Sequence, residues 1–220
     1  MTSATGVRTP GWWVGLSGLV FVGLLIAAIP IGTAPEADDS DTTILDYYTD
    51  SGNQVKQMIS VIILATALVA LLAFVVGMRG VLLDAGAPSS LADLALAGGI
   101  AAVTLALAGW AVGTAVPATF IFSDTFELDA DTARVILTAG NIWLVTFAGA
   151  VGSALVAAVS LASRRTGLFP AWLEWTGLVA APLMLLTLPL FGLPAVLLVL
   201  WVLAASIVLL LRSRGAAQEL

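Results

Sequence analysis

Long stretches without a charged side chain constrain this sequence more than any other feature. The first, residues 12–32, runs for 21 residues without an acidic or basic side chain. A helix of that length, rising about 1.5 Å per residue, crosses the ~30 Å hydrocarbon core of a bilayer. Similar stretches recur along the chain. We therefore expect an all-α fold, a polytopic membrane helical bundle, with about six transmembrane helices at 12–32, 58–78, 94–118, 135–163, 172–190 and 194–211.

The composition also indicates that lipid is the solvent. The 220 residues are 60% hydrophobic and 10% charged, whereas a soluble domain is about 45–50% apolar and about 25% charged. We expect 1–220 to form a single transmembrane domain with external acidic loops at 33–57 and 119–134. The first span is expected to be a retained helix, because its apolar run exceeds the core of a cleaved signal peptide.

The distribution of lysine and arginine predicts the orientation. With six spans, both termini lie on one side of the membrane. Cytoplasmic segments carry an excess of these residues, so both termini are expected in the cytoplasm, in a bacterial or archaeal plasma membrane. Six basic residues fall on that side (Arg8, Arg79, Arg164, Arg165, Arg212 and Arg214) and two on the other (Lys56 and Arg134).

Two absent residue types exclude several chemistries. The chain has no cysteine, which excludes disulfides, iron–sulfur ligation and thiolate zinc sites. It has no histidine, the usual haem and catalytic zinc ligand and the usual general base near neutral pH. No basic patch indicates nucleic-acid binding. We therefore expect a protein that is not an enzyme and holds no cofactor.

The first external loop, 33–57, has an internal pattern. Any of residues 41–43 can cap a short helix that runs to Tyr48. Residues 51–53 then interrupt it, and the second transmembrane helix starts near Gln54. The apolar side of the short helix would lie on the membrane interface or on the outer mouth of the bundle. The alternative, which we favour, is a solvated loop with its tyrosines at headgroup level.

Acidic side chains of the two external loops are candidate cation ligands. Calcium prefers such oxygen donors, but the full twelve-residue calcium loop and its glycine are missing. The interpretation we favour is that these acids keep the outer face solvated and that those near residue 130 stabilise the start of the next helix. The metal candidates are Asp38, Asp39, Asp41, Asp129 and Asp131, which would converge with Asp124 and Glu127.

Inside the spans there is no ionisable group at mid-depth, which argues against an ion-coupled transporter. The candidates for a cavity or for polar contacts between helices are Asn141, Thr104, Thr114 and Glu174. Glu174 follows Pro170 in the first turn of a helix, where an acidic group is favourable. It can pair with Arg164 or Arg165, or face an inner vestibule.

Small residues and prolines predict how the helices pack. Glycines or serine recur at a spacing of four residues in three places, and this spacing lets helix backbones approach closely. The pattern fits a tight bundle or a dimer face equally well. Pro182 and Pro189 are expected to kink or end the fifth span. The spaced pairs are Gly11 and Gly15, Gly109 and Gly113, and Gly149 and Ser153.

The chain resembles a family of six-helix integral membrane proteins of high-GC actinobacteria, known as a domain of unknown function. The resemblance is carried by Asp46-Tyr47-Tyr48 in the first loop, by Leu94-Ala95-Leu96-Ala97-Gly98-Gly99 opening the third span, and by residues 168–178. It implies the fold and a location in the inner membrane. It implies no activity.

Three functions fit these observations. The first is a non-enzymatic accessory, scaffold or lipid-contacting subunit, whose partners are membrane lipids and a membrane protein or a second copy of the chain. The second is a transporter or channel for an uncharged or lipophilic small molecule. The third is an enzyme that acts at the outer leaflet through paired carboxylates. We rank them in that order, because the sequence offers no catalytic group.

Overall fold

The computed structural model describes residues 11–123 and 125–218, with side chains as far as Ser213. Arg8, Asp124 and the side chain of Arg214 lie outside this part. The described residues form helices joined by turns and contain no strand, which confirms the all-α prediction. The elements are α1 (Gly11–Ile31), α2 (Asp41–Thr49), α3 (Ser51–Asp84), α4 (Ser89–Gly113), α5 (Ala115–Phe122), α6 (Ala130–Asn141), the π-helix η1 (Ile142–Phe147), α7 (Ala148–Thr166), α8 (Ala171–Leu186) and α9 (Leu193–Gln218).

Five helical segments of the described chain are long and apolar enough to cross a membrane: α1, α3, α4, the continuous helix Ala130–Thr166 and Leu193–Ser213 of α9. The length and composition of these segments therefore support a membrane helical bundle. The predicted span at 172–190 corresponds to α8, which has 16 residues, fewer than the ~20 of a typical transmembrane helix.

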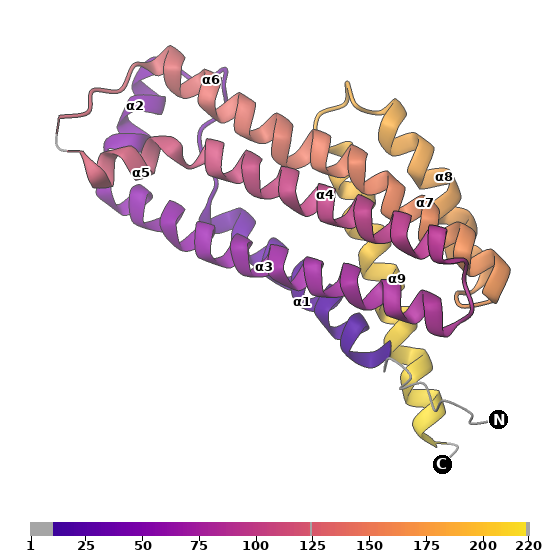
Figure 1. Cartoon of the computed structure of the whole chain (residues 1–220). Coiled ribbons are helices and arrows are strands. Elements are labelled where there is room, and N and C mark those ends of the chain that lie inside the picture. Colours follow the sequence, from indigo (N-terminus) through magenta and orange to yellow (C-terminus); the bar gives the residue numbers. More distant parts are fainter. Residues whose placement is uncertain (1–10, 124, 219–220) are drawn as a thin grey trace, which may run out of the picture.

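The long helices pack side by side, and the two ends of the bundle differ (Figure 1). α3 packs against α1 and α4, α4 packs against α6, η1 and α7, and α8 lies against α7 and α9. One end carries residues 33–49, α5 and the first turns of α6, which together we call the cap. The opposite end, which we call the base, holds the start of α1 and the turns at 85–88 and 167–170 (Figure 1).

The cap stands beyond the end of α1. The Ser60 hydroxyl donates to the carbonyl of Ala28 at 3.3 Å, and a Cβ on Gly32 would meet Ser60. The last turn of α1 is therefore level with Ser60, and residues 51–59 of α3 project past it. With 34 residues, α3 is about 51 Å long at 1.5 Å per residue, far longer than the ~30 Å hydrocarbon core.

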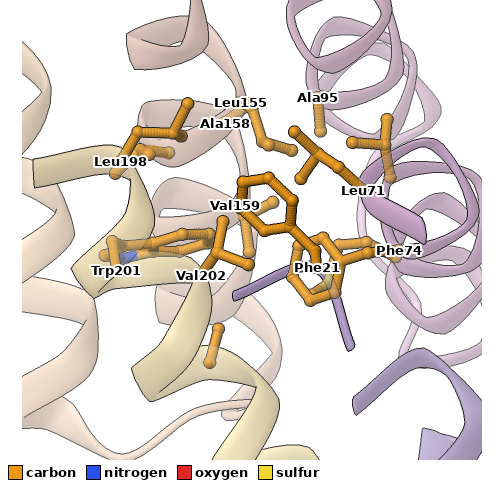
Figure 2. Close-up of a cluster of buried hydrophobic side chains, with 14 of the residues drawn as sticks. Phe21, Leu71, Phe74, Ala95, Leu155, Ala158, Val159, Leu198, Trp201 and Val202 are labelled. Atoms are coloured by element: carbon orange, nitrogen blue, oxygen red, sulfur yellow. The ribbon is translucent and has the colours of Figure 1, made fainter. Parts of the chain in front are cut away.

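Close backbone contacts hold the helices together. A Cβ on Gly109 of α4 would meet the Leu144 nitrogen and, at 2.7 Å, the Gly140 carbonyl oxygen. A Cβ on Gly140 would lie 2.7 Å from the Cα of Gly113. The predicted pair Gly109 and Gly113 thus lies where α4 crosses the α6–η1 helix of the same chain. The core between these contacts is apolar, and Phe21, Leu71, Phe74, Leu155 and Trp201 meet there from α1, α3, α7 and α9 (Figure 2).

The two prolines near the fifth span behave differently. α8 continues through Pro182 and ends at Leu186, three residues before Pro189. The chain then turns at Gly192, whose φ of +84° is a left-handed conformation that favours glycine. α9 starts directly after this turn, and Gly149 of α7 touches its backbone at Ala195.

We expect Gly109→Ala to destabilise the bundle by about 1–3 kcal/mol, because the added methyl must displace backbone atoms of the neighbouring helix. Gly113→Ala is the matched control, since its Cβ would meet its nearest neighbour, the Cα of Gly140, at 3.9 Å. Thermal unfolding in a mild detergent measures the difference. Equal melting temperatures for the two variants would contradict the close contact at Gly109.

Candidate functional site

A cavity of about 370 Å³ lies where the cap meets the bundle. Its walls come from the loop after α1, from α3, from the end of α4 and from the α6–η1 helix, and Phe191 reaches it from the turn between α8 and α9. Four glycines are among its lining residues. Its polar lining residues are Glu36, Gln57, Trp110, Thr114, Thr138 and Asn141, and its glycines are Gly32, Gly109, Gly113 and Gly140.

The polar groups of this cavity are mostly neutral hydrogen-bonding groups. Gln57 is 6% exposed, and its Nε2 donates to the Tyr47 hydroxyl at 3.0 Å. The Thr114 hydroxyl donates to the Trp110 carbonyl at 2.9 Å. The Trp110 Nε1 is buried and has no hydrogen-bond partner within the described residues. Glu36 is the one charged side chain among the lining residues, so the cavity offers donors and acceptors with little net charge.

The structure places the predicted polar residues in three different environments. Asn141 and Thr114 line the cavity. Thr104 is exposed on α4, and its hydroxyl donates to the Ile100 carbonyl of its own helix at 2.9 Å. Glu174 lies at the base. Gln57 was not singled out from the sequence, because a glutamine beside Lys56 at the start of a span carries no sign that it faces inward.

The short helix in the first acidic loop is present as α2, and it packs on the mouth of the bundle. Ser40 rather than residues 41–43 caps it, accepting from the Thr43 backbone nitrogen at 3.2 Å. Ile44 and Tyr48 are both 2% exposed and pack with residues of α5 and α6. Burial raises the pKa of Tyr48 to about 12. The favoured alternative, a solvated loop, is therefore wrong for this segment.

Tyr47 connects α2 to the cavity. Its hydroxyl donates to the Thr33 carbonyl at 2.8 Å and accepts from Gln57, a lining residue. Two further amides of α3 hold the same turn: Gln54 Nε2 donates to the Tyr48 carbonyl at 2.8 Å, and Asn53 Nδ2 donates to the Tyr47 carbonyl at 3.4 Å. α2 is thus fixed to the wall of the cavity by side chains as well as by packing.

Arg134 of α6 joins the acidic segments of the cap. Its Nη2 donates to Asp41 Oδ1 at 2.7 Å and to the Asp39 carbonyl at 2.8 Å. Its Nε donates to the Ala37 carbonyl at 3.0 Å, and its Nη1 to Asp131 Oδ1 at 3.0 Å. The Arg134 side chain is 23% exposed. One arginine therefore ties the loop, α2 and α6 together.

Most of the candidate metal ligands are engaged in hydrogen bonds or ion pairs with groups of the protein. Asp41 and Asp131 bind Arg134, and Asp39 Oδ2 accepts from the Glu36 backbone nitrogen at 2.8 Å. Asp129 caps α6 by accepting from the Thr132 nitrogen at 3.0 Å, and this bond lowers the pKa of Asp129. Asp38 is exposed. Within the described residues no three acidic side chains form a group that could hold a metal ion.

The wall of the cavity includes a rare helical form. η1 interrupts the long α6–η1–α7 helix immediately after Asn141, and its Leu144 lines the cavity. Such π-helical turns occur mostly as single-turn insertions and are frequent at functional sites. Thr146 in η1 is 5% exposed, and its hydroxyl has no partner among the described residues. The α6–η1–α7 helix therefore departs from regular α-helical hydrogen bonding in the segment that borders the cavity.

Glu174 forms a separate buried contact at the base. Its Oε1 accepts from the Ser163 hydroxyl at 2.7 Å, and the Ser163 oxygen accepts from the Phe169 backbone nitrogen at 2.7 Å. This chain of hydrogen bonds closes the turn between α7 and α8. Arg164 lies instead over the Trp175 ring, 4.4 Å from its centroid. Glu174 therefore fixes a helix connection and does not line the cap cavity.

No family model, curated protein or solved structure matches the chain. The resemblance to actinobacterial membrane proteins therefore stays a prediction.

We expect Arg134→Gln to loosen the cap. The substitution removes the ion pairs with Asp41 and Asp131 and the guanidinium hydrogen bonds to the carbonyls of Ala37 and Asp39. Hydrogen exchange of the amides in 35–49 should become faster, while the amides of α4 and α7 stay protected. Asp131→Asn is the matched control. Asp131 is 89% exposed, and its loss leaves the other three partners of Arg134 in place. Equal exchange in both variants would contradict the role of Arg134.

Proposed function

We propose that this chain is a non-enzymatic membrane protein that holds a small uncharged molecule in the cap cavity. One observation carries the proposal: the cavity lies between helices and the loop after α1 and is lined by amide, hydroxyl and indole groups, with Glu36 as the single charged side chain among its lining residues. Its volume of about 370 Å³ falls within the ~300–1,000 Å³ range of small-molecule sites.

The lining favours a neutral ligand that forms hydrogen bonds. A buried charge needs a charged partner, and Glu36, an exposed residue of the loop, is the one candidate on the wall. A polar uncharged molecule, in contrast, can bond to Asn141 and Thr138. The lipophilic surface of Leu137, Leu144 and Phe191 would contact its apolar part.

An accessory role in a membrane complex is the second candidate. The apolar core and the glycine contacts between α4 and the α6–η1 helix support it, because they describe a rigid bundle without a reacting group inside. An enzyme at the outer leaflet has less support. Asp41 and Asp131 both bind Arg134, so these carboxylates are neutralised by an arginine and do not face a groove as a catalytic pair.

We further propose six crossings, with the cap outside the cell and the termini in the cytoplasm. α8 begins at the base, and Phe191 in the turn after it lines the cap cavity. The α8–α9 hairpin therefore reaches the cavity beneath the cap, which supports a sixth crossing. Four arginines with described side chains lie at the base, and this bias supports the orientation: Arg79, Arg164, Arg165 and Arg212.

Native mass spectrometry of the gently solubilised chain tests the ligand proposal. We expect a small molecule to stay bound to the natural chain. Asn141→Leu should weaken its retention about tenfold, the worth of one hydrogen bond of ~1.4 kcal/mol. Gly113→Leu should remove the molecule by filling the cavity.

The matched control is Gly23→Leu, because a side chain at Gly23 meets nothing within 4 Å and points away from the cavity. This variant should keep the bound molecule. The proposal fails if the natural chain carries no small molecule, or if Gly113→Leu retains it as well as Gly23→Leu does.

Cysteine labelling tests the orientation, and the chain has no cysteine of its own to interfere. We expect Asp38→Cys, in the cap, to react with an impermeant maleimide added to intact cells. Arg165→Cys, at the base, should react only after the membrane is opened. Both residues are exposed, so reactivity reports the side of the membrane. Reaction of Arg165→Cys in intact cells would overturn the orientation.

A further inference from the structure

A second hollow lies on the side of the bundle, between α8 and α9. It has a volume of about 480 Å³, and apolar side chains of both helices form its walls. Trp175, Val179 and Leu200 border it and are each 55–56% exposed, so the hollow opens sideways, on a surface that faces lipid in a membrane. We call it the α8–α9 groove. Leu173, Val179, Leu183, Leu197, Leu200 and Ala204 form its apolar walls.

Two arginines lie where the groove approaches the base. The guanidinium of Arg164 lies over the ring of Trp175, which lines the groove. Arg212 of α9 donates through Nη1 to the carbonyl of Gly167, in the turn between α7 and α8, at 3.2 Å. Both arginines are exposed. They therefore present positive charge close to the end of an apolar groove.

Arg79 and Arg134, in contrast to these two arginines, form ion pairs. Arg79 binds Asp93 at 2.8 Å, and Arg134 binds Asp41 and Asp131. In the described part of the chain, neither Arg164 nor Arg212 is paired with a carboxylate. Their charge remains available for an anionic group from outside the chain.

We propose that the α8–α9 groove binds one acyl chain of an anionic phospholipid, whose phosphate is held by Arg164 and Arg212. Acyl chains in the bilayer are as apolar as the groove walls. The groove therefore fits an acyl chain by its shape but does not distinguish one phospholipid from another. Selection must come from the headgroup, and clustered arginines at a membrane surface attract anionic lipids. The guanidinium fork also matches phosphate geometry.

A phospholipid fits this site better than a helix from a partner protein. A helix is about 10 Å wide including its side chains, whereas the groove is a hollow of about 480 Å³ between two helices that are already in contact. A partner helix would also leave the two arginines without an anion. The inference requires the bundle to lie in a membrane, but it does not depend on a ligand in the cap cavity.

The test uses the full chain in mixed micelles that contain phosphatidylglycerol and phosphatidylcholine with the same acyl chains, in equal amounts. Native mass spectrometry counts which lipid stays bound. We expect phosphatidylglycerol to be retained preferentially. Replacing Arg164 and Arg212 together by glutamine should remove this preference, with a loss of about fivefold for each arginine at a membrane surface. Arg79→Gln is the matched control, and it should keep the preference.

A second pair of variants tests the groove itself. Ala204→Phe places a ring in the groove and should lower the retention of phosphatidylglycerol. Ala111→Phe adds the same ring on the exposed face of α4, outside the groove, and should leave retention unchanged. The proposal is overturned if both lipids are retained equally, if Arg79→Gln loses the preference as fully as the double variant, or if Ala204→Phe and Ala111→Phe behave alike.

Discussion

The pairing of backbone polar groups without water is the constraint on which this structure depends. In hydrocarbon each N–H and C=O must be bonded within the chain, and helices meet this requirement locally. Helices in lipid gain little from burying apolar side chains against one another, so close packing has to hold them together. The contacts of Gly109 with Gly140 and of Gly149 with α9 show how this is achieved. Small residues let the backbones approach, and larger side chains such as Phe74 fill the remaining space.

The same constraint explains where the cap cavity forms. α4 ends at Gly113, and the chain turns into α5 at this level. Gly109 and Gly140 let α4 and the α6–η1 helix touch, whereas a Cβ on Gly113 would have its nearest neighbour at 3.9 Å, which leaves room in the cavity. In the cap, where water is available, polar bonds replace close packing. Ser40, Asp50 and Asp129 cap helices, and Arg134 joins three segments.

The sequence predicted the class of fold, because long uncharged runs leave few alternatives. It placed the start of the second transmembrane helix near Gln54 and its apolar span at 58–78, whereas α3 begins at Ser51. A helix does not stop at the membrane surface, and the capping side chain of Asp50 sets its start. Asn141 and Thr114 were recognised as polar groups near the end of a span. Arg134 was not, because its partners Ala37 and Asp39 lie about a hundred residues away in the chain, and no local pattern reports such a contact.

Arg134 in the cap and two arginines of the base, Arg164 and Arg212, are used in opposite ways, and this difference connects the fold to the membrane. In the cap, Arg134 is surrounded by two carboxylates and two carbonyls, which satisfy its donors and neutralise its charge. At the base, Arg164 rests on an aromatic ring and Arg212 on a single carbonyl. Anionic lipids concentrate in the cytoplasmic leaflet. In the proposed orientation the base lies beside such a leaflet, and cations left without a carboxylate are stable there. In the same orientation Arg134 lies on the outer side, where Asp41 and Asp131 of its own chain supply the negative charge that neutralises it.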